Sequence, residues 1–156
     1  MEEYEYSIKA KSIKPYIDYC EKNKYKLKEK VRQNRKVYEC RYSKDIIARL
    51  TTTYKDSNKE TVFDCKNIGT RTASLKISKE SMPLEITDEN IEKIESILST
   101  FNFYESANND RIRYVYEKDG VKFEIDDYTS PKMCVIGIEG EKNKVDLIYN
   151  EVKDMR

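Results

Sequence analysis

The chain has 156 residues, of which 38% are hydrophobic and 38% are charged, and its 30 Lys and Arg against 29 Asp and Glu leave a net charge of +1. This near-neutral balance gives no global field that would attract a nucleic acid or a membrane surface. The chain contains no His, which excludes Ser-His and Cys-His nucleophile pairs and zinc sites with imidazole ligands. Its four Gly form neither a G-x-G-x-x-G nor a P-loop pattern, so Rossmann and P-loop nucleotide sites are excluded as well.

The first half of the chain predicts one strand, one helix and then four more strands. Residues 3–9 alternate between polar and apolar side chains, which is the period of a strand, and this period places Glu3 and Glu5 on one face. Apolar residues recur at helical spacing over residues 13–28, which predicts a helix packed on a sheet. The stretch that follows is rich in β-branched and aromatic residues and predicts strands at residues 36–42, 45–54, 60–66 and 71–78.

The second half predicts a helix, three strands and a closing helix. Residues 87–101 carry an apolar stripe at helical spacing, with two acidic residues in the first turn that favour the helix dipole. The Asp119-Gly120 pair predicts a hairpin turn between the first two of the three strands. These strands lie near residues 110–117, 121–127 and 132–139, and the closing helix covers residues 143–153.

These elements predict a single α+β domain that spans residues 1–156, with eight strands and about three flanking helices. No Pro/Gly/Ser-rich linker and no internal repeat divides the chain. Eight mostly sequential antiparallel strands are enough to close a small barrel that holds one ligand. An eight-stranded antiparallel closed β-barrel is therefore one fold that these elements allow, beside an open sheet.

Charged residues occupy the polar face of nearly every predicted strand. They are Glu3, Glu5, Arg49, Asp64, Lys66, Lys76, Arg111, Arg113, Glu124, Asp126 and Glu139. One interpretation is a sheet with a solvated, salt-bridged outer face, as antiparallel sheets often have. The other is a closed barrel whose polar faces point inward, where unpaired charges would cost several kcal/mol each and would require a ligand. Arg and Lys in this number would bind a polyphosphate. Carboxylates can share a cavity with that polyphosphate only where hard ions such as Mg²⁺ or Mn²⁺ lie between them and the phosphates.

The same residues resemble the pattern of a known superfamily. Glu3-x-Glu5 on the first strand, Arg49 and Lys76 in mid-chain, Arg111-Ile-Arg113, Glu124-Ile-Asp126 and Glu139 near the end look like the CYTH, or triphosphate tunnel metalloenzyme, superfamily. The resemblance spans residues 3–140. It implies an eight-stranded antiparallel tunnel that binds triphosphates with Mg²⁺ or Mn²⁺. Members include inorganic and thiamine triphosphatases, class IV adenylate cyclases and metal-dependent RNA 5′-triphosphatases.

The resemblance also implies roles for individual residues. Glu3, Glu5 and Glu139 would be the catalytic metal ligands, and the further acidic contributors to the metal would be Asp126 and Glu124. The residues expected to hold the phosphates are Lys9, Arg49, Lys66, Lys76, Arg111 and Arg113. Lys66 and Lys76 compete for the family's mid-chain lysine, and the sequence leaves both open.

Two positions depart from the family pattern. The first strand usually reads Glu-x-Glu-x-Lys, whereas this chain has Ser7 at the third position and a lysine only at Lys9. The last strand usually offers Glu-x-Glu, whereas this chain has Gly137 before Glu139. Both departures fall on the metal and phosphate machinery, so weak, altered or lost activity is an open alternative.

The function expected from the sequence is a metal-dependent triphosphatase that removes the terminal phosphate of inorganic triphosphate, a nucleoside triphosphate or an RNA 5′-triphosphate. The alternatives are a class IV adenylate cyclase, which would also need an adenine pocket that the sequence does not reveal, and a module that binds nucleotide or polyphosphate without turnover. The expected partners are a triphosphate-containing small molecule or an RNA 5′ end, with no DNA and no membrane, in a monomer or homodimer. Four widely spaced cysteines and an acidic, polar N-terminus favour a cytoplasmic protein with reduced thiols.

Overall fold

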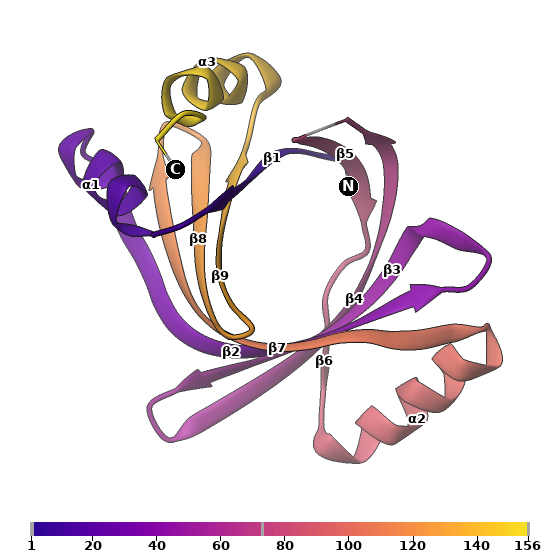
Figure 1. Ribbon diagram of the computed structural model, residues 1–156. Coiled ribbons are helices and arrows are strands. Elements are labelled where there is room, and N and C mark those ends of the chain that lie inside the picture. Colours follow the sequence, from indigo (N-terminus) through magenta and orange to yellow (C-terminus); the bar gives the residue numbers. More distant parts are fainter. Residues whose placement is uncertain (1, 73, 156) are drawn as a thin grey trace.

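The computed structural model describes residues 2–72 and 74–155, and most of its regular structure is β-strand (Figure 1). Its helices are α1 (Lys14–Lys22), α2 (Asp88–Thr100) and α3 (Lys142–Val152). Its strands are β1 (Glu2–Ala10), β2 (Lys26–Cys40), β3 (Ser43–Lys55), β4 (Asn58–Arg71), β5 (Leu75–Glu80), β6 (Leu84–Ile86), β7 (Phe103–Lys118), β8 (Val121–Ser130) and β9 (Lys132–Glu139). None of these described helices is long and apolar enough to cross a membrane.

The strands close into a barrel. Within the described residues, neighbouring strands pair antiparallel in the order β3-β2-β7-β8-β9-β1-β5-β4, and β3 also pairs with β4, which completes a ring of eight. The short strand β6 pairs with β4 outside this ring and leads into α2. Figure 1 looks through the ring, with α1 and α3 outside one part of it and α2 outside another. The expected α+β fold, an eight-stranded closed barrel with three flanking helices, is confirmed.

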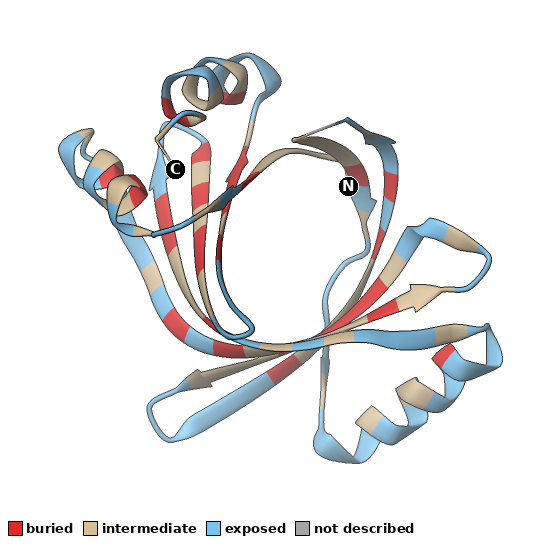
Figure 2. Ribbon diagram, viewed as in Figure 1, coloured by how far each residue is buried: buried red, intermediate tan, exposed pale blue. Residues whose placement is uncertain are grey.

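The apolar core lies outside the barrel wall, between the sheet and two of the helices. Strand β8 alternates, so that Phe123 and Ile125 face outward and are fully buried against α1 and α3. Tyr16 of α1 and Val145 of α3 are buried in the same cluster. Burial at this level removes roughly 2 kcal/mol of unfavourable water contact per large side chain. Figure 2 shows the resulting alternation of buried and partly buried positions along β8.

A second, smaller core holds α2 against the other side of the barrel. Leu98 of α2 packs with Tyr38, Ala48 and Leu50 on the outer faces of β2 and β3. The Tyr38 hydroxyl donates a 2.6 Å hydrogen bond to Glu95, which fixes the helix along the strand. The two cores cover two parts of the outer face of the barrel.

The boundaries of several expected elements differ from the structure. Helix α1 ends at Lys22 rather than at residue 28, because the Asn23 amide donates to the carbonyl of Tyr19 and Lys24 adopts a left-handed φ of 62°. Strand β2 then begins at Lys26, ten residues earlier than expected. The strand expected at residues 71–78 is in fact the end of β4, a turn and β5; residue 73 lies outside the described residues.

The hairpin predicted at Asp119-Gly120 is confirmed. Strand β7 ends at Lys118 and β8 begins at Val121, and the two residues between them have φ angles of 49° and 78°. Two positive φ values in a two-residue loop are typical of the turn that matches the right-handed twist of a hairpin. This turn lies at one end of the barrel, where it matters for the cavity described below.

Candidate active site

The inner face of the barrel encloses a tunnel of about 390 Å³ whose wall is mostly charged or polar. Successive side chains of a strand point to opposite faces, so the residues that alternate with the outer core must point inward. The sequence-predicted residues that line the tunnel are Glu3, Glu5, Arg49, Lys66, Lys76, Arg111, Arg113, Glu124, Asp126 and Glu139. Lys9 is not among the described residues of this wall; its side chain is exposed near the end of β1. The alternative of a solvated outer face for these charges is therefore wrong.

Three carboxylates gather at one end of the tunnel, and we call Glu3, Glu5 and Glu139 the carboxylate cluster. One oxygen of each lies within 4.8 Å of the others. The sheet register explains their meeting, because Glu5 of β1 is directly opposite Glu139 of β9, and Glu3 is two residues from Glu5 on the same face. Lys122 holds one oxygen of Glu139, Oε1, at 2.8 Å. The other oxygen, Oε2, is buried and has no hydrogen-bond partner among the described residues.

The electrostatics of the carboxylate cluster favour a cation. Burial, the adjoining Glu3 carboxyl and the charge of Glu124 together raise the pKa of Glu139 to about 8. Burial also raises the pKa of Glu5, although the charge of Lys66 opposes this rise. Carboxylate oxygens are the ligands that hard divalent ions prefer. The crowded carboxylates and the orphaned Oε2 of Glu139 thus form a donor set that fits such an ion.

Both candidate lysines reach the tunnel. Lys66 of β4 is only 6% exposed, and its Nζ lies 3.5 Å from Glu3 Oε2 and 3.5 Å from Glu80 Oε1. Lys76 of β5 also lines the wall, and it is directly opposite Glu5 in the pairing of β1 with β5. The structure therefore brings both Lys66 and Lys76 to the carboxylate cluster rather than choosing between them.

Arg49 is locked by two carboxylates. Its Nε and Nη2 donate to the two oxygens of Asp64 at 2.9 and 2.6 Å, and Nη2 also donates to Glu80 at 2.9 Å. Burial lowers the pKa of Arg49, but these two carboxylates outweigh burial and hold it above its usual range. A bidentate pair of this kind fixes the plane of the guanidinium as well as its charge.

A second arginine network lies on β7 and β8. Arg113 donates through Nε and Nη2 to both oxygens of Asp126, at 2.7 and 2.9 Å, and through Nη1 to Glu124 at 2.7 Å. Arg111 is 1% exposed and donates to Gln33 and, at 3.3 Å, to Asp126. Burial disfavours the charged form of Asp126, but Arg113 and Arg111 outweigh burial and lower its pKa. Asp126 and Glu124, expected as metal ligands, are thus placed as acceptors for Arg113 and lie outside the carboxylate cluster.

Arg35 of β2 is a tunnel residue that sequence reasoning missed. Its Nε donates to the Thr51 hydroxyl at 3.1 Å, and within the described part of the chain it forms no ion pair with a carboxylate. Burial and the charges of Arg111, Arg113 and Arg49 together lower its pKa well below the usual value. A guanidinium with these neighbours is short of negative charge, which an anion in the tunnel would supply.

Two other tunnel residues that sequence reasoning missed could have been found from the alternation of side chains along their strands. Lys122 shares a strand face with Glu124 and Asp126 at two-residue spacing, and Glu80 shares one with Lys76, so alternation was enough to find both. Arg35 could not be found this way, because its strand carries charge on both faces and its start was assigned to a helix. The inner face of β2 became clear only from its pairing with β3 and β7.

The sequence matches no protein-family model and no curated protein, but solved structures share its fold. The PH1012 protein from Pyrococcus horikoshii OT3 is 14% identical, with 97% of this chain and 88% of that chain covered and a TM-score of 0.76. A conserved hypothetical protein from Pyrococcus furiosus is 17% identical, with 97% and 88% covered and a TM-score of 0.74. A candidate adenylyl cyclase from Hippeastrum, described as having a dominant triphosphatase activity, is 14% identical, with 97% and 87% covered and a TM-score of 0.68.

Similarity over 97% of the chain at such low identity is a similarity of fold. It agrees with the closed ring of eight strands. The eight-stranded tunnel that the resemblance to the CYTH superfamily implied is therefore the fold of this chain.

Proposed function

We propose that this protein is a metal-dependent triphosphatase that hydrolyses the terminal phosphate of a triphosphorylated substrate inside the tunnel. One observation carries the proposal: the carboxylate cluster, with oxygens within 4.8 Å of one another, opens into the same cavity as a row of cations. These cations are Arg35, Arg49, Lys66, Lys76, Arg111 and Arg113. Phosphoryl transfer requires little covalent chemistry from a protein and depends on positioning and charge stabilisation, which this wall offers.

The carboxylate cluster would hold Mg²⁺ or Mn²⁺ through Glu3, Glu5 and Glu139. A bound divalent ion supplies charge neutralisation at phosphate oxygens. Lys122 and Lys66 limit the negative charge that the cluster carries, because their ammonium groups lie 2.8 Å from Glu139 and 3.5 Å from Glu3. A glutamate of the cluster would also orient the attacking water, since no His is present to do so.

The arginines differ in how readily they can bind phosphate. Arg49 and Arg113 already donate to two carboxylates each, so they set the field and shape of the wall. Arg35 lacks such a carboxylate within the described residues and is the arginine that gains most from an anion. We therefore assign to Arg35 a direct phosphate contact, and to Arg111, whose main partner is the neutral Gln33, a second one.

The proposal is tested by measuring phosphate release from inorganic triphosphate, ATP and a 5′-triphosphorylated RNA, each with Mg²⁺ or Mn²⁺. Release from one of these substrates that stops on addition of EDTA supports a triphosphatase and identifies its substrate class. Product analysis separates the adenylate cyclase alternative, because a cyclase would convert ATP to cyclic AMP and pyrophosphate and release no orthophosphate. The Hippeastrum protein, described both as a candidate cyclase and as a triphosphatase, makes this control necessary.

A second candidate function is binding without turnover, and one observation favours it. Ser7 and Gly137, the two departures from the family pattern, both line the tunnel next to the carboxylate cluster. A binding module would gain thermal stability from triphosphate and metal, as any ligand that binds only the folded state confers. It would release no phosphate from any of the three substrates, which separates it from the enzyme.

A further inference from the structure

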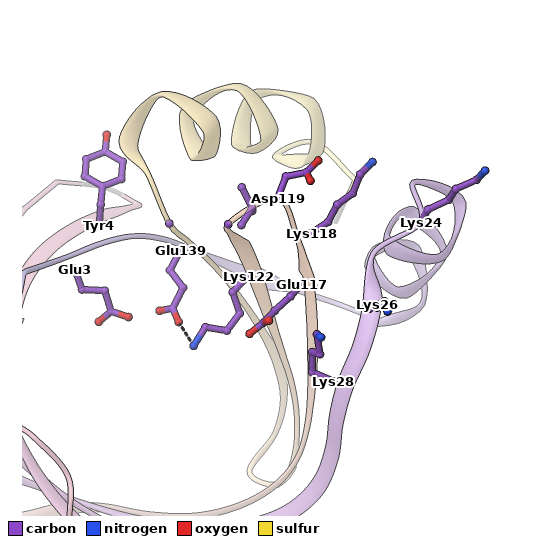
Figure 3. Close-up of a pocket in the computed structure, with 13 residues that line it drawn as sticks. Glu3, Tyr4, Lys24, Lys26, Lys28, Glu117, Lys118, Asp119, Lys122 and Glu139 are labelled. Carbon is purple, nitrogen blue, oxygen red and sulfur yellow. Dashed lines mark ion pairs between the residues drawn. The ribbon is translucent and has the colours of Figure 1, made fainter.

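A second cavity, of about 760 Å³, lies at one mouth of the tunnel. It is lined by the start of β2, the β7–β8 hairpin and the end of β9, and it shares Glu3, Lys122 and Glu139 with the tunnel wall. Figure 3 shows Lys122 reaching to Glu139 while Glu3 faces them from β1. The cavity therefore continues the tunnel outward from the carboxylate cluster.

This mouth carries an excess of lysine. Outside the Lys122–Glu139 pair and Glu3, its charged lining residues are Lys24, Lys26, Lys28 and Lys118 against Glu117 and Asp119. We call the four residues Lys24, Lys26, Lys28 and Lys118 the lysine mouth; all four are exposed. None of them forms an ion pair with a carboxylate elsewhere in the described residues, and Lys118 donates instead to the carbonyl of Asn23. Four flexible ammonium groups are thus available to an anion that emerges from the tunnel.

The backbone explains why these lysines gather. Lys24 has a left-handed φ of 62° at the turn that reverses the chain between α1 and β2. Lys26 then pairs directly with Glu117 of β7, and the register shifts between Leu27 and Glu29, so that Lys28 is the extra residue of a β-bulge. Figure 3 shows Lys24, Lys26 and Lys28 along the turn and the start of β2 at the edge of this cavity.

The lining is poorly suited to nucleobases. Tyr4 is the aromatic residue among the described lining residues, and its hydroxyl donates a 2.9 Å hydrogen bond to Asp146. Its ring packs edge-on against Tyr6 and has the Lys142 ammonium 5.6 Å from its centre, so its surroundings are already filled. Recognition of single-stranded RNA normally relies on aromatic rings that are free to stack on bases. The mouth instead offers charge alone, which suits a chain of phosphates.

We propose that the lysine mouth is a second anion site, which binds the phosphates beyond the third of a linear inorganic polyphosphate whose end lies in the tunnel. This inference rests on the proposed function for the placement of the chain end. The tunnel cations hold the terminal phosphates, and the lysine mouth holds the chain where it leaves the carboxylate cluster. Affinity then grows with chain length beyond triphosphate.

The test compares the dissociation constants of inorganic triphosphate and of a long-chain linear polyphosphate, measured with Mg²⁺ by stopped-flow mixing before phosphate is released. The wild-type protein is expected to bind the long chain more tightly. We express the preference for the long chain as the dissociation constant of triphosphate divided by that of polyphosphate. In the double variant Lys26→Glu/Lys28→Glu, this ratio is expected to fall about tenfold, because two exposed charge contacts become repulsive. The matched control Lys44→Glu/Lys93→Glu makes the same change of net charge at exposed positions outside the mouth, and it is expected to keep the wild-type ratio.

Three results would overturn the inference: equal affinity of the wild type for both chains, an equal fall of the ratio in the control, or tighter binding of a 5′-triphosphorylated oligoribonucleotide than of polyphosphate. The proposed function fails separately. A protein that releases no phosphate with Mg²⁺ or Mn²⁺ but keeps the dependence on chain length has the lysine mouth without the enzyme. A protein that releases phosphate but ignores chain length has the enzyme without this site.

Discussion

Ser7 and Gly137 lie directly opposite each other in the antiparallel pairing of β1 with β9, and both face the tunnel. In the family pattern these positions carry a lysine and a glutamate. The two departures are therefore the two halves of one cross-strand pair, and side chains in such positions contact each other. Losing both removes one cation and one anion together, so the net charge of the tunnel is unchanged. The Ser7 hydroxyl now donates to Glu5 at 3.3 Å instead.

Restoring the glutamate alone should lower the stability of the protein, and restoring the lysine as well should recover it. A Cβ at position 137 would lie 3.8 Å from the Cβ of Glu124 and 3.9 Å from the Cδ of Glu5, so the space exists but the charge is wrong. We expect Gly137→Glu alone to lower the free energy of unfolding by about 1–3 kcal/mol, because the new carboxylate is buried without a partner. Adding Ser7→Lys should recover most of this loss. Thermal denaturation of the wild type, both single variants and the double variant measures the coupling, and purely additive effects would contradict the pairing.

Arg35 and Arg113 should respond differently to the same substitution. Arg113→Met removes the arginine partner of Glu124 and leaves the buried Asp126 with only its 3.3 Å contact to Arg111, and we expect it to cost about 3 kcal/mol of stability. Arg35→Met removes a cation that has no carboxylate partner among the described residues and that lies near three other guanidinium groups. We expect the Arg35 variant to keep or raise the melting temperature while its KM for triphosphate rises. Urea denaturation measures the stability of both variants, and steady-state kinetics measures the KM of the Arg35 variant. Equal destabilisation by both variants would argue against the assignment of Arg35.

The Cys20 thiol gives a test of the packing between α1 and the barrel. Burial, followed by the charge of Glu21, raises the pKa of this thiol from 9.0 to about 12. Since the folded state prefers the neutral thiol, the stability from this preference is complete below pH 9 and is lost as the pH rises through about 12. At pH 9 the folded protein should therefore leave Cys20 unmodified by iodoacetamide, and urea should expose it. Peptide mass mapping reads the result; rapid modification in the folded state would show that α1 does not cover the thiol.

Alternation of polar and apolar residues was enough to predict most strands and to say which residues share a face, while the resemblance to the CYTH superfamily was needed to place the charged faces inside a closed barrel. Glu3, Glu5, Arg111 and Arg113 lie on short segments whose opposite face is apolar, so only one arrangement buries the apolar residues against helices. The confirmed turn at Asp119-Gly120 added a firm boundary. A pattern with period two identifies a face even when the partner strands are unknown.

What the sequence could not predict depends on pairing between distant strands. The carboxylate cluster exists because β1 pairs with β9, and the alternation within each strand says nothing of that register. The same is true of the contact between Lys66 and Glu3, which are 63 residues apart. Lys9 shares a face with Glu5, yet it lies too far along β1 to reach the tunnel wall, because a strand advances about 3.3 Å per residue.

The measurement that most directly tests the central claim is phosphate release from inorganic triphosphate with Mg²⁺ or Mn²⁺ by the wild type, Glu3→Ala and Glu5→Ala, with Glu92→Ala on the exposed face of α2 as a control. We expect the wild type and the control to release phosphate in a reaction that EDTA abolishes. The two cluster variants should lose at least about a hundredfold in rate while retaining the far-ultraviolet circular dichroism of the folded barrel. Wild-type rates in either folded cluster variant would contradict the placement of catalysis at the carboxylate cluster.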